Sequence, residues 1–273
     1  MAGLFQVLYG KPDGKFGKAE VLNGTDGKPL IIPADREHIV DAICTRPFAV
    51  DWNGDGHLDL VVGNFKGTFY WFRGEGKGAF HPEPEPIRLG AELLHIQGYH
   101  SDPFAIDWDG DGDLDLVSGS AQGGVQWAEN VAGAGKLPEL RAFQWLIKPV
   151  QESQKGEDEE PQDIDVVTED GLTGPTKSTR VWVADVNGDG KLDLLVGDSL
   201  TLIAPADGLT VAAMKQKSAE WKKRYAAAVK ELEAAQDDEQ RSKVQEKFSK
   251  IYEQRTEFLK EDDTGFVWLY LQK

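Results

Sequence analysis

One phrase occurs three times in this chain of 273 residues, and it constrains the fold more than any other feature. The copies read PFAVDWNGDGHLDLVVG from Pro47, PFAIDWDGDGDLDLVSG from Pro103 and RVWVADVNGDGKLDLLVG from Arg180. Such repetition is typical of architectures in which each copy is one structural unit packed on its neighbours. Each copy ends in a short β-rich run closed by Gly, which predicts a buried strand.

The spacing of the copies predicts a β-propeller built from four-stranded blades. Asp51 and Asp107 begin equivalent loops 56 positions apart, which suits one such blade. Aromatic-rich runs follow at 67–72 and 124–127, and the equivalent run of the third copy arrives late, at 265–271. Residues 1–35 form half a repeat, because residues 5–9 align with residues 69–73. The blades with loops are therefore expected at 41–90, 98–148 and 180–273.

Two stretches interrupt this pattern. The third loop, which begins at Asp185, lies 78 positions after the second. The excess fits residues 151–178, which are acidic and lack aromatic side chains, and which we interpret as a flexible, solvated loop.

The second interruption spans residues 209–262, where the apolar pattern changes from a strand period to a helix period. Residues at helical spacing are Met214, Trp221, Tyr225, Ala228, Leu232 and Ala235, then Val244, Phe248, Ile251 and Phe258. Asp237, with Gln240 three positions later, is typical of a helix N-cap and divides the stretch in two. We predict an inserted antiparallel α-helical hairpin of coiled-coil type. It either packs on the rim of a blade or serves as an arm for a partner.

The repeated loop D-x-[ND]-G-D-G-x-L-D has the composition of a calcium site. Oxygen-bearing side chains fall at positions 1, 3, 5 and 9, and a tight turn aims them at one point. Position 7 varies among the copies (His57, Asp113, Lys191), so its backbone carbonyl is the expected ligand there. The predicted side-chain ligands are Asp51, Asn53, Asp55 and Asp59; Asp107, Asp109, Asp111 and Asp115; and Asp185, Asn187, Asp189 and Asp193. The apolar residues at positions 2 and 8 are expected to point into the core.

Two other calcium motifs do not fit. An EF-hand loop requires an acidic residue at position 12 and a helix on each side. Position 12 is instead Val62, Ser118 or Val196, within the predicted strands. EF-hands and dockerin-like modules are therefore excluded.

Composition restricts the classes of partner. The formal net charge of −17 argues against nucleic-acid binding, which depends on Lys and Arg. The sequence holds a single cysteine, Cys44, so no intrachain disulfide can form. We expect no membrane span, since no stretch approaches the required length of about 20 apolar residues.

With these loops identified, the chain resembles the FG-GAP or VCBS repeat family, the calcium-loop propeller blades of integrin α-subunits and of many secreted bacterial proteins. The resemblance covers about 4–89, 103–146, 180–197 and 265–273. It implies an all-β propeller or partial propeller, about three Ca²⁺ ions held at positions 1, 3, 5, 7 and 9 of each loop, and an extracellular, cell-surface or periplasmic setting. Three loops and a half repeat are fewer blades than the family's usual six or seven. Either further blades complete the ring, or the strands around 5–8 and 16–22 pair with 266–271.

The leading functional hypothesis is a non-catalytic binding or adhesion module whose protein or polysaccharide ligand contacts loops on one face. One alternative is a carbohydrate-active propeller, either a lectin or a lyase-like enzyme. His95 and His100 flank residues 96–99, and a pair of Tyr99 with a histidine there would then be a candidate for acid and base, although no recognised catalytic phrase surrounds it. A further alternative is a structural segment of a larger surface protein.

Overall fold

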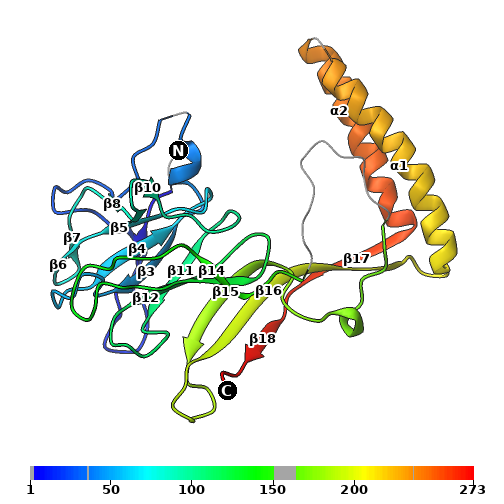
Figure 1. Cartoon of the computed structure of the whole chain (residues 1–273). Helices are drawn as coiled ribbons and strands as arrows, with labels where there is room; N and C mark the ends of the chain where they lie inside the picture. The colour runs from blue at the N-terminus through cyan, green and yellow to red at the C-terminus, as the bar shows by residue number, and fades with distance from the viewer. Residues whose placement is uncertain (1–2, 36, 151–163, 236) are drawn as a thin grey trace. The chain divides into compact units, whose positions relative to one another are not determined.

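The computed structural model describes residues 3–35, 37–150, 164–235 and 237–273, and the chain divides into two compact units (Figure 1). Unit 1 comprises Met1–Glu152, Gly174–Asp198 and Phe266–Lys273. Unit 2 comprises Ser153–Thr173 and Ser199–Gly265. Most of the flexible loop expected at 151–178 lies outside the described residues. Its described part contains the 3₁₀ turn Glu169–Gly171 and a bridge from Val167 to Ile203.

Unit 1 contains two complete four-stranded antiparallel sheets, each formed by consecutive strands. Sheet 1 has the order β3-β4-β5-β8, with bounds Arg46–Val50, Asp59–Gly63, Phe69–Phe72 and Glu85–Pro86. Sheet 2 has the order β11-β12-β13-β14, with bounds Asp102–Ile106, Asp115–Gly119, Val125–Ala128 and Gln144–Ile147. Every residue of β4 (DLVVG) and β12 (DLVSG) is buried, as expected for strands packed on both faces.

Sheet 3 has the order β15-β16-β18 within unit 1. Its strands are β15 (Lys177–Ala184), β16 (Asp193–Pro205) and β18 (Val267–Tyr270). The first part of β16 pairs with β18, from Leu194 opposite Tyr270 to Gly197 opposite Val267. The second part of β16 belongs to unit 2 and pairs with β17 (Leu259–Thr264). One long strand therefore enters both units, and the helical insertion lies between β16 and β18.

The three sheets stack face to face in chain order through two apolar cores. Between sheets 1 and 2, Val61, Phe69 and Trp71 pack with Ala105 and Leu116. Between sheets 2 and 3 the buried residues are Phe104, Val117, Val125, Val183, Leu194 and Val196. Alternate residues of each inner strand thus contribute to opposite cores, because successive strand side chains point to opposite faces.

The N-terminal segment covers the remaining face of sheet 1. Strands β1 (Gln6–Val7) and β2 (Glu20–Val21) pair with each other. Phe5, Leu30 and Ile32 pack on the sheet 1 residues Leu60, Val62 and Phe72. Since β18 pairs with β16 and β1 with β2, the strands of the described residues close no ring. The shorter elements are β6 (Gly74–Gly76), β7 (Ala79–Phe80), β9 (Arg88–Leu89), β10 (Glu92–Leu93) and the 3₁₀ turns Ile39–Ala42 and Gln254–Glu257.

Unit 2 contains the two helices that the apolar spacing predicts, α1 (Val211–Ala234) and α2 (Asp238–Glu253), side by side and antiparallel (Figure 1). Asp237 is the N-cap of α2, and its carboxylate accepts a hydrogen bond from the Gln240 N–H at 2.8 Å. The unit's core is centred on Trp221, which stacks on Tyr225 and whose Nε1 donates to the Ile251 carbonyl at 2.6 Å. None of the described helices has the length and apolarity needed to cross a membrane.

Trp221→Ala is expected to lower the free energy of unfolding of unit 2 by about 3–5 kcal/mol, because it removes a buried aromatic side chain and a hydrogen bond. Denaturant unfolding followed by circular dichroism at a helical wavelength measures the change. Val211→Ala, at an exposed position of the same helix, is the control and should be nearly neutral. Equal effects of the two substitutions would contradict a core centred on Trp221.

Candidate metal centres

Each repeated loop joins the first two strands of a sheet. Loop 1 (51–59) joins β3 to β4, loop 2 (107–115) joins β11 to β12, and loop 3 (185–193) joins β15 to β16. The glycines at positions 4 and 6 have positive φ in all three loops, for example +74° at Gly54 and +87° at Gly56. L-residues with a Cβ rarely adopt these values, so glycine at both positions allows the tight turn.

The carboxylate at position 1 holds the turn closed. In loop 1, Asp51 accepts hydrogen bonds from the N–H groups of Asp55 and Gly56 at 3.0 and 2.9 Å. In loop 2, Asp107 accepts from Gly110 and Gly112 at 2.8 and 3.0 Å. The equivalent Asp185 of loop 3 accepts from the N–H groups of residues 188, 189 and 190. The loops are therefore ordered by their own side chains.

The carboxylate at position 9 is buried and connects the loop to the third strand of its sheet. One oxygen of Asp59 accepts from the Trp52 N–H at 2.9 Å, and the other from the Gly74 N–H at 2.5 Å. Asp115 accepts in the same way from Trp108 and Asn130, at 3.0 and 2.7 Å.

The third copy repeats this bridge: Asp193 accepts from Val186 and Gln272, both at 3.0 Å. Gly74, Asn130 and Gln272 each lie two residues after the third strand, although Gln272 is 79 positions from Asp193. The sequence predicted position 9 only as a ligand and did not reveal this second partner.

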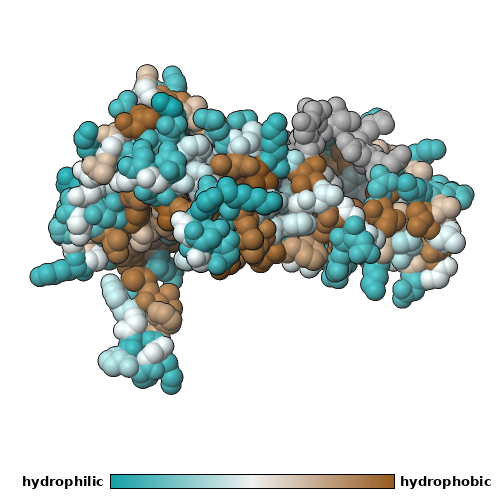
Figure 2. Space-filling model, turned by 60° about the horizontal axis from the view of Figure 1, so that its bottom comes forward, coloured by the Kyte–Doolittle hydropathy of each residue, from teal (hydrophilic) through white to brown (hydrophobic). Residues whose placement is uncertain are grey.

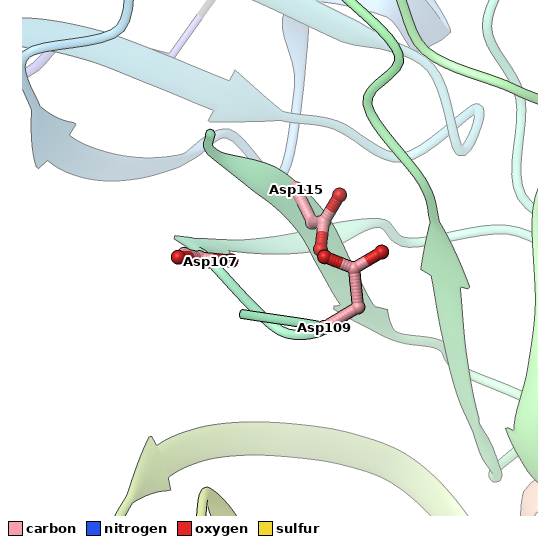
Figure 3. Close-up of side chains that lie close together, drawn as sticks. All are labelled: Asp107, Asp109 and Asp115. Atoms are coloured by element: carbon pink, nitrogen blue, oxygen red, sulfur yellow. The ribbon is translucent and has the colours of Figure 1, made fainter. Parts of the chain in front are cut away.

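In loop 2 the structure brings three predicted ligands together. Carboxylate oxygens of Asp107, Asp109 and Asp115 lie within 4.8 Å of one another (Figure 3). Two oxygens on opposite sides of a Ca²⁺ ion are about 4.6–5.2 Å apart, so this spacing suits that ion. Loops 1 and 3 carry an amide at position 3, Asn53 and Asn187, and so have one carboxylate fewer among the predicted side-chain ligands.

The side chain at position 5 binds the backbone at position 7. The carboxylates of Asp55, Asp111 and Asp189 accept from the N–H groups of His57, Asp113 and Lys191 at 2.9, 3.1 and 2.9 Å. At position 7 the Asp113 carboxylate is itself buried and accepts from the Gly133 N–H at 2.7 Å. This side chain therefore ties loop 2 to the loop after β13, a structural role that sequence variation at position 7 concealed.

Burial and hydrogen bonding act on the pKa values of the loop carboxyls in opposite directions. Burial raises the pKa of Asp59 and of Asp115, and backbone N–H donors only partly offset it. In the exposed part of the loops, the Asn53 amide and the His57 N–H lower the pKa of Asp55. A carboxyl with a raised pKa in the folded state stabilises the fold at low pH, and this contribution is lost as the pH rises through that pKa. Burial thus disfavours the charged form of these two carboxyls, a cost that a bound cation would reduce.

The expectation that positions 2 and 8 point into the core holds for four of the six residues. Trp52 is buried and Leu114 is half-buried in the core between sheets 1 and 2, and Trp108 and Leu192 are half-buried against the core between sheets 2 and 3. The expectation is wrong for Leu58 of loop 1, which is 62 % exposed, and for Val186 of loop 3, which is 46 % exposed.

A groove of about 770 Å³ lies beside loop 2. Its lining combines the indole rings of Trp108 and Trp127 with the carboxylates of Asp107 and Asp109 and with Lys191 of loop 3. Such a surface offers apolar faces and hydrogen-bonding groups together.

Tyr99 and His100, noted in the sequence as a possible acid–base pair, lie just before β11. The His100 ring packs against the rings of Phe65 and Tyr99, with centroid-to-centroid distances of 4.4 and 5.2 Å. Burial is the main cause of the lowered pKa of His100, and Arg46 and Arg180 act in the same direction. The imidazole is therefore neutral over a wider pH range than usual.

Comparison with protein families matches residues 51–118 to the FG-GAP-like repeat. No curated protein and no solved structure matches the chain. The matched residues begin at the first residue of loop 1 and end within β12, so they include loops 1 and 2. Residues 51–118 are therefore similar to the FG-GAP-like repeat, in agreement with the resemblance seen in the sequence.

Proposed function

We propose that this chain is a calcium-binding, non-catalytic module of the β-propeller type that acts as an extracellular binding or adhesion domain. The observation that carries the proposal is the threefold repetition of one loop geometry, with three carboxylates within 4.8 Å of one another in loop 2. The FG-GAP-like match over residues 51–118 supports the same reading. Four-stranded sheets that pack face to face in chain order are the arrangement expected of successive blades.

The donor set of the loops fits Ca²⁺. The side chains at positions 1, 3, 5 and 9 supply carboxylate and amide oxygens, and the backbone carbonyl at position 7 adds another. This number of oxygen ligands approaches the six to eight that Ca²⁺ takes. Although both oxygens of Asp115 accept an N–H, a carboxylate oxygen has a further lone pair for a cation. A bound ion would offset the repulsion among these carboxylates and hold the first three strands of each sheet together.

The groove beside loop 2 favours a second candidate function, recognition of a carbohydrate. Sugars bind proteins by stacking their apolar faces on aromatic rings while their hydroxyl groups form hydrogen bonds. Trp108 and Trp127 supply the rings, and Asp109 and Lys191 the hydrogen-bonding groups. This candidate makes the module a lectin.

Calcium should raise the thermal unfolding midpoint of the chain. Millimolar Ca²⁺ is about 1–10 times a Kd of about 10⁻⁴–10⁻³ M, so each occupied site adds about 0.4–1.4 kcal/mol to the free energy of unfolding. Thermal unfolding in EGTA and in millimolar Ca²⁺ measures the effect, and Asp55→Ala, Asp109→Ala and Asp189→Ala should each remove part of it. Glu92→Ala, outside the loops, is the control. A midpoint indifferent to Ca²⁺ would contradict the proposal.

In the absence of calcium, substitutions at position 9 and at position 3 of loop 2 should differ in their effect on the free energy of unfolding. Asp115→Asn replaces an oxygen that accepts a buried N–H by an NH₂ group, so it should lower stability in EGTA by about 1–3 kcal/mol. Asp109→Asn changes an exposed side chain and should leave stability in EGTA within about 0.5 kcal/mol of wild type. Both should weaken the response to Ca²⁺. Denaturant unfolding in EGTA checks this separation, and equal losses would contradict it.

Glycan-array screening followed by calorimetry tests the lectin candidate. Trp108→Ala should weaken binding of a glycan hit by about 10-fold, since it removes a stacking surface. Trp182→Ala, an exposed tryptophan outside the groove, is the matched control and should bind as wild type does. The absence of any glycan signal would contradict the lectin candidate.

A further inference from the structure

A second set of equivalent positions lies in the first strand of each sheet, five residues before each loop begins. Arg46, Asp102 and Arg180 occupy this position in the three copies, and all three belong to unit 1. The first strands β3, β11 and β15 are neighbours in the stack, so these side chains meet, although Arg180 follows Asp102 by 78 positions. Five residues of extended strand separate them from the loops by roughly 16 Å.

The cluster places two guanidinium groups beside one carboxylate. Arg180 Nη1 donates a hydrogen bond to Asp102 Oδ1 at 2.9 Å, whereas Arg46 Nη1 is 3.9 Å from the same oxygen, beyond hydrogen-bonding distance. Arg46 Nη1 is buried and has no hydrogen-bond partner among the described residues. Because arginine keeps its charge in proteins, two fixed cations share one carboxylate and the cluster has a positive charge in excess.

His100 adds a third nitrogen to this cluster. Its Nε2 is also buried and finds no hydrogen-bond partner within the described part of the chain. Burial lowers the pKa of His100, and Arg46 and then Arg180 lower it further, as expected for groups in close proximity. A neutral imidazole that carries its proton on Nε2 donates a hydrogen bond there. Buried polar atoms nearly always have a partner, so two unpartnered nitrogens in one place point to a ligand with acceptor oxygens.

The backbone on either side of the cluster residues is held by buried hydroxyl groups. Ser101 Oγ accepts from the Asn64 N–H at 2.9 Å and donates to the Thr68 carbonyl at 2.8 Å. In the next copy Thr179 Oγ1 accepts from the Ser120 N–H at 2.8 Å. Ser101 lies between His100 and Asp102, and Thr179 precedes Arg180, so these bonds fix the positions from which the cluster side chains project.

The residues two positions before the cluster have a strained backbone. Cys44, His100 and Ser178 have φ of +54°, +61° and +53°. A positive φ is uncommon for residues with a Cβ and is often found at ligand sites. The strain therefore recurs in all three copies at the same end of the first strand.

The excess of positive charge is unusual for this chain. Hydrophilic residues, in teal, are spread over the face of the molecule drawn in Figure 2, and over the whole sequence 47 Asp and Glu outnumber 30 Lys and Arg. An anion is repelled by the chain as a whole, so a site for one requires a local excess of positive charge. The Arg180 side chain is 51 % exposed, against 20 % for Arg46 and 18 % for Asp102, so an anion would approach from the side of Arg180.

We propose that Arg46, Arg180 and His100 bind an oxyanion of a ligand, either a carboxylate or a sulfate group. The forked N–H groups of arginine match two oxygens of such a group, and His100 Nε2 supplies a further donor. Asp102 is a positioning residue that orients Arg180 and, by like-charge repulsion, limits the affinity for the anion. This site goes beyond the proposed calcium module and does not depend on a bound cation.

Titration of the full chain with sodium sulfate, and separately with sodium acetate, tests the proposal. The histidine ring resonances are followed by nuclear magnetic resonance, with sodium chloride at matched ionic strength as the reference for screening. The His100 resonance, identified by its loss in His100→Gln, should shift in a saturable way at millimolar concentrations of at least one of the two anions. The anion that responds identifies the group as sulfate or carboxylate.

Substitutions within the cluster should change the affinity in opposite directions. Arg180→Gln should weaken binding about 10-fold, because it removes a charged donor. Asp102→Asn should tighten binding several-fold, because it removes the competing negative charge; if this variant does not fold, Arg46→Gln takes its place and should weaken binding as Arg180→Gln does. Arg141→Gln is the matched control: Arg141 forms the same kind of ion pair, with Glu129 at 2.8 Å, outside the cluster, and should bind as wild type does.

Three results would overturn the proposal: a His100 resonance that responds to neither anion, an Arg180→Gln variant that binds as wild type does, or an Asp102→Asn variant that binds less tightly. The last would show that the three charged side chains form a closed ion-pair network. The titration is repeated in EGTA and in millimolar Ca²⁺ together with the thermal unfolding midpoint. Anion binding without a calcium response refutes only the calcium proposal, and a calcium response without anion binding refutes only this inference.

Discussion

The buried carboxylate at position 9 of each loop is the interaction on which the rest of the structure depends. Asp59, Asp115 and Asp193 each accept one N–H from their own loop and one from the chain just after the third strand. A single side chain thus fixes the loop, the start of the second strand and the end of the third. Burial raises the pKa of Asp59 and of Asp115, so a cation bound beside either carboxylate would offset the cost of its charge.

The same unit, repeated, produces a stack whose interior and ends differ. Position 2 of one loop and position 8 of the next belong to the same apolar core, and sheets 1 and 2 each pack on the following sheet. The same sequence position therefore differs in burial among the copies: position 8 is half-buried in loops 2 and 3 but exposed at Leu58, and position 2 is exposed at Val186. This difference follows from nearest-neighbour packing, which is a general property of repeat proteins.

Local pattern was sufficient to predict the loops, the buried strands after them and the two helices. The glycines, the run DLVVG and the N-cap Asp237 each act through neighbours a few residues away. What required the structure was contact between distant residues. Neither the bridge from Asp193 to Gln272 nor the division of β16 between two units leaves a short-range signal. The Asp113 carboxylate accepts from Gly133, twenty positions away, so the sequence predicted only a backbone ligand at position 7 and no role for this side chain.

Equilibrium dialysis of the intact chain against Ca²⁺ tests the central claim most directly, because it counts bound ions without relying on stability. The account predicts about three ions per chain with affinities in the range of extracellular calcium modules, about 10⁻⁴–10⁻³ M. It also predicts that Mg²⁺ at the same concentration displaces few of them, because Mg²⁺ demands near-ideal octahedral geometry and dehydrates reluctantly. A chain that retains no Ca²⁺ above the dialysis background would contradict the account, and the loops would then be turns held by hydrogen bonds alone.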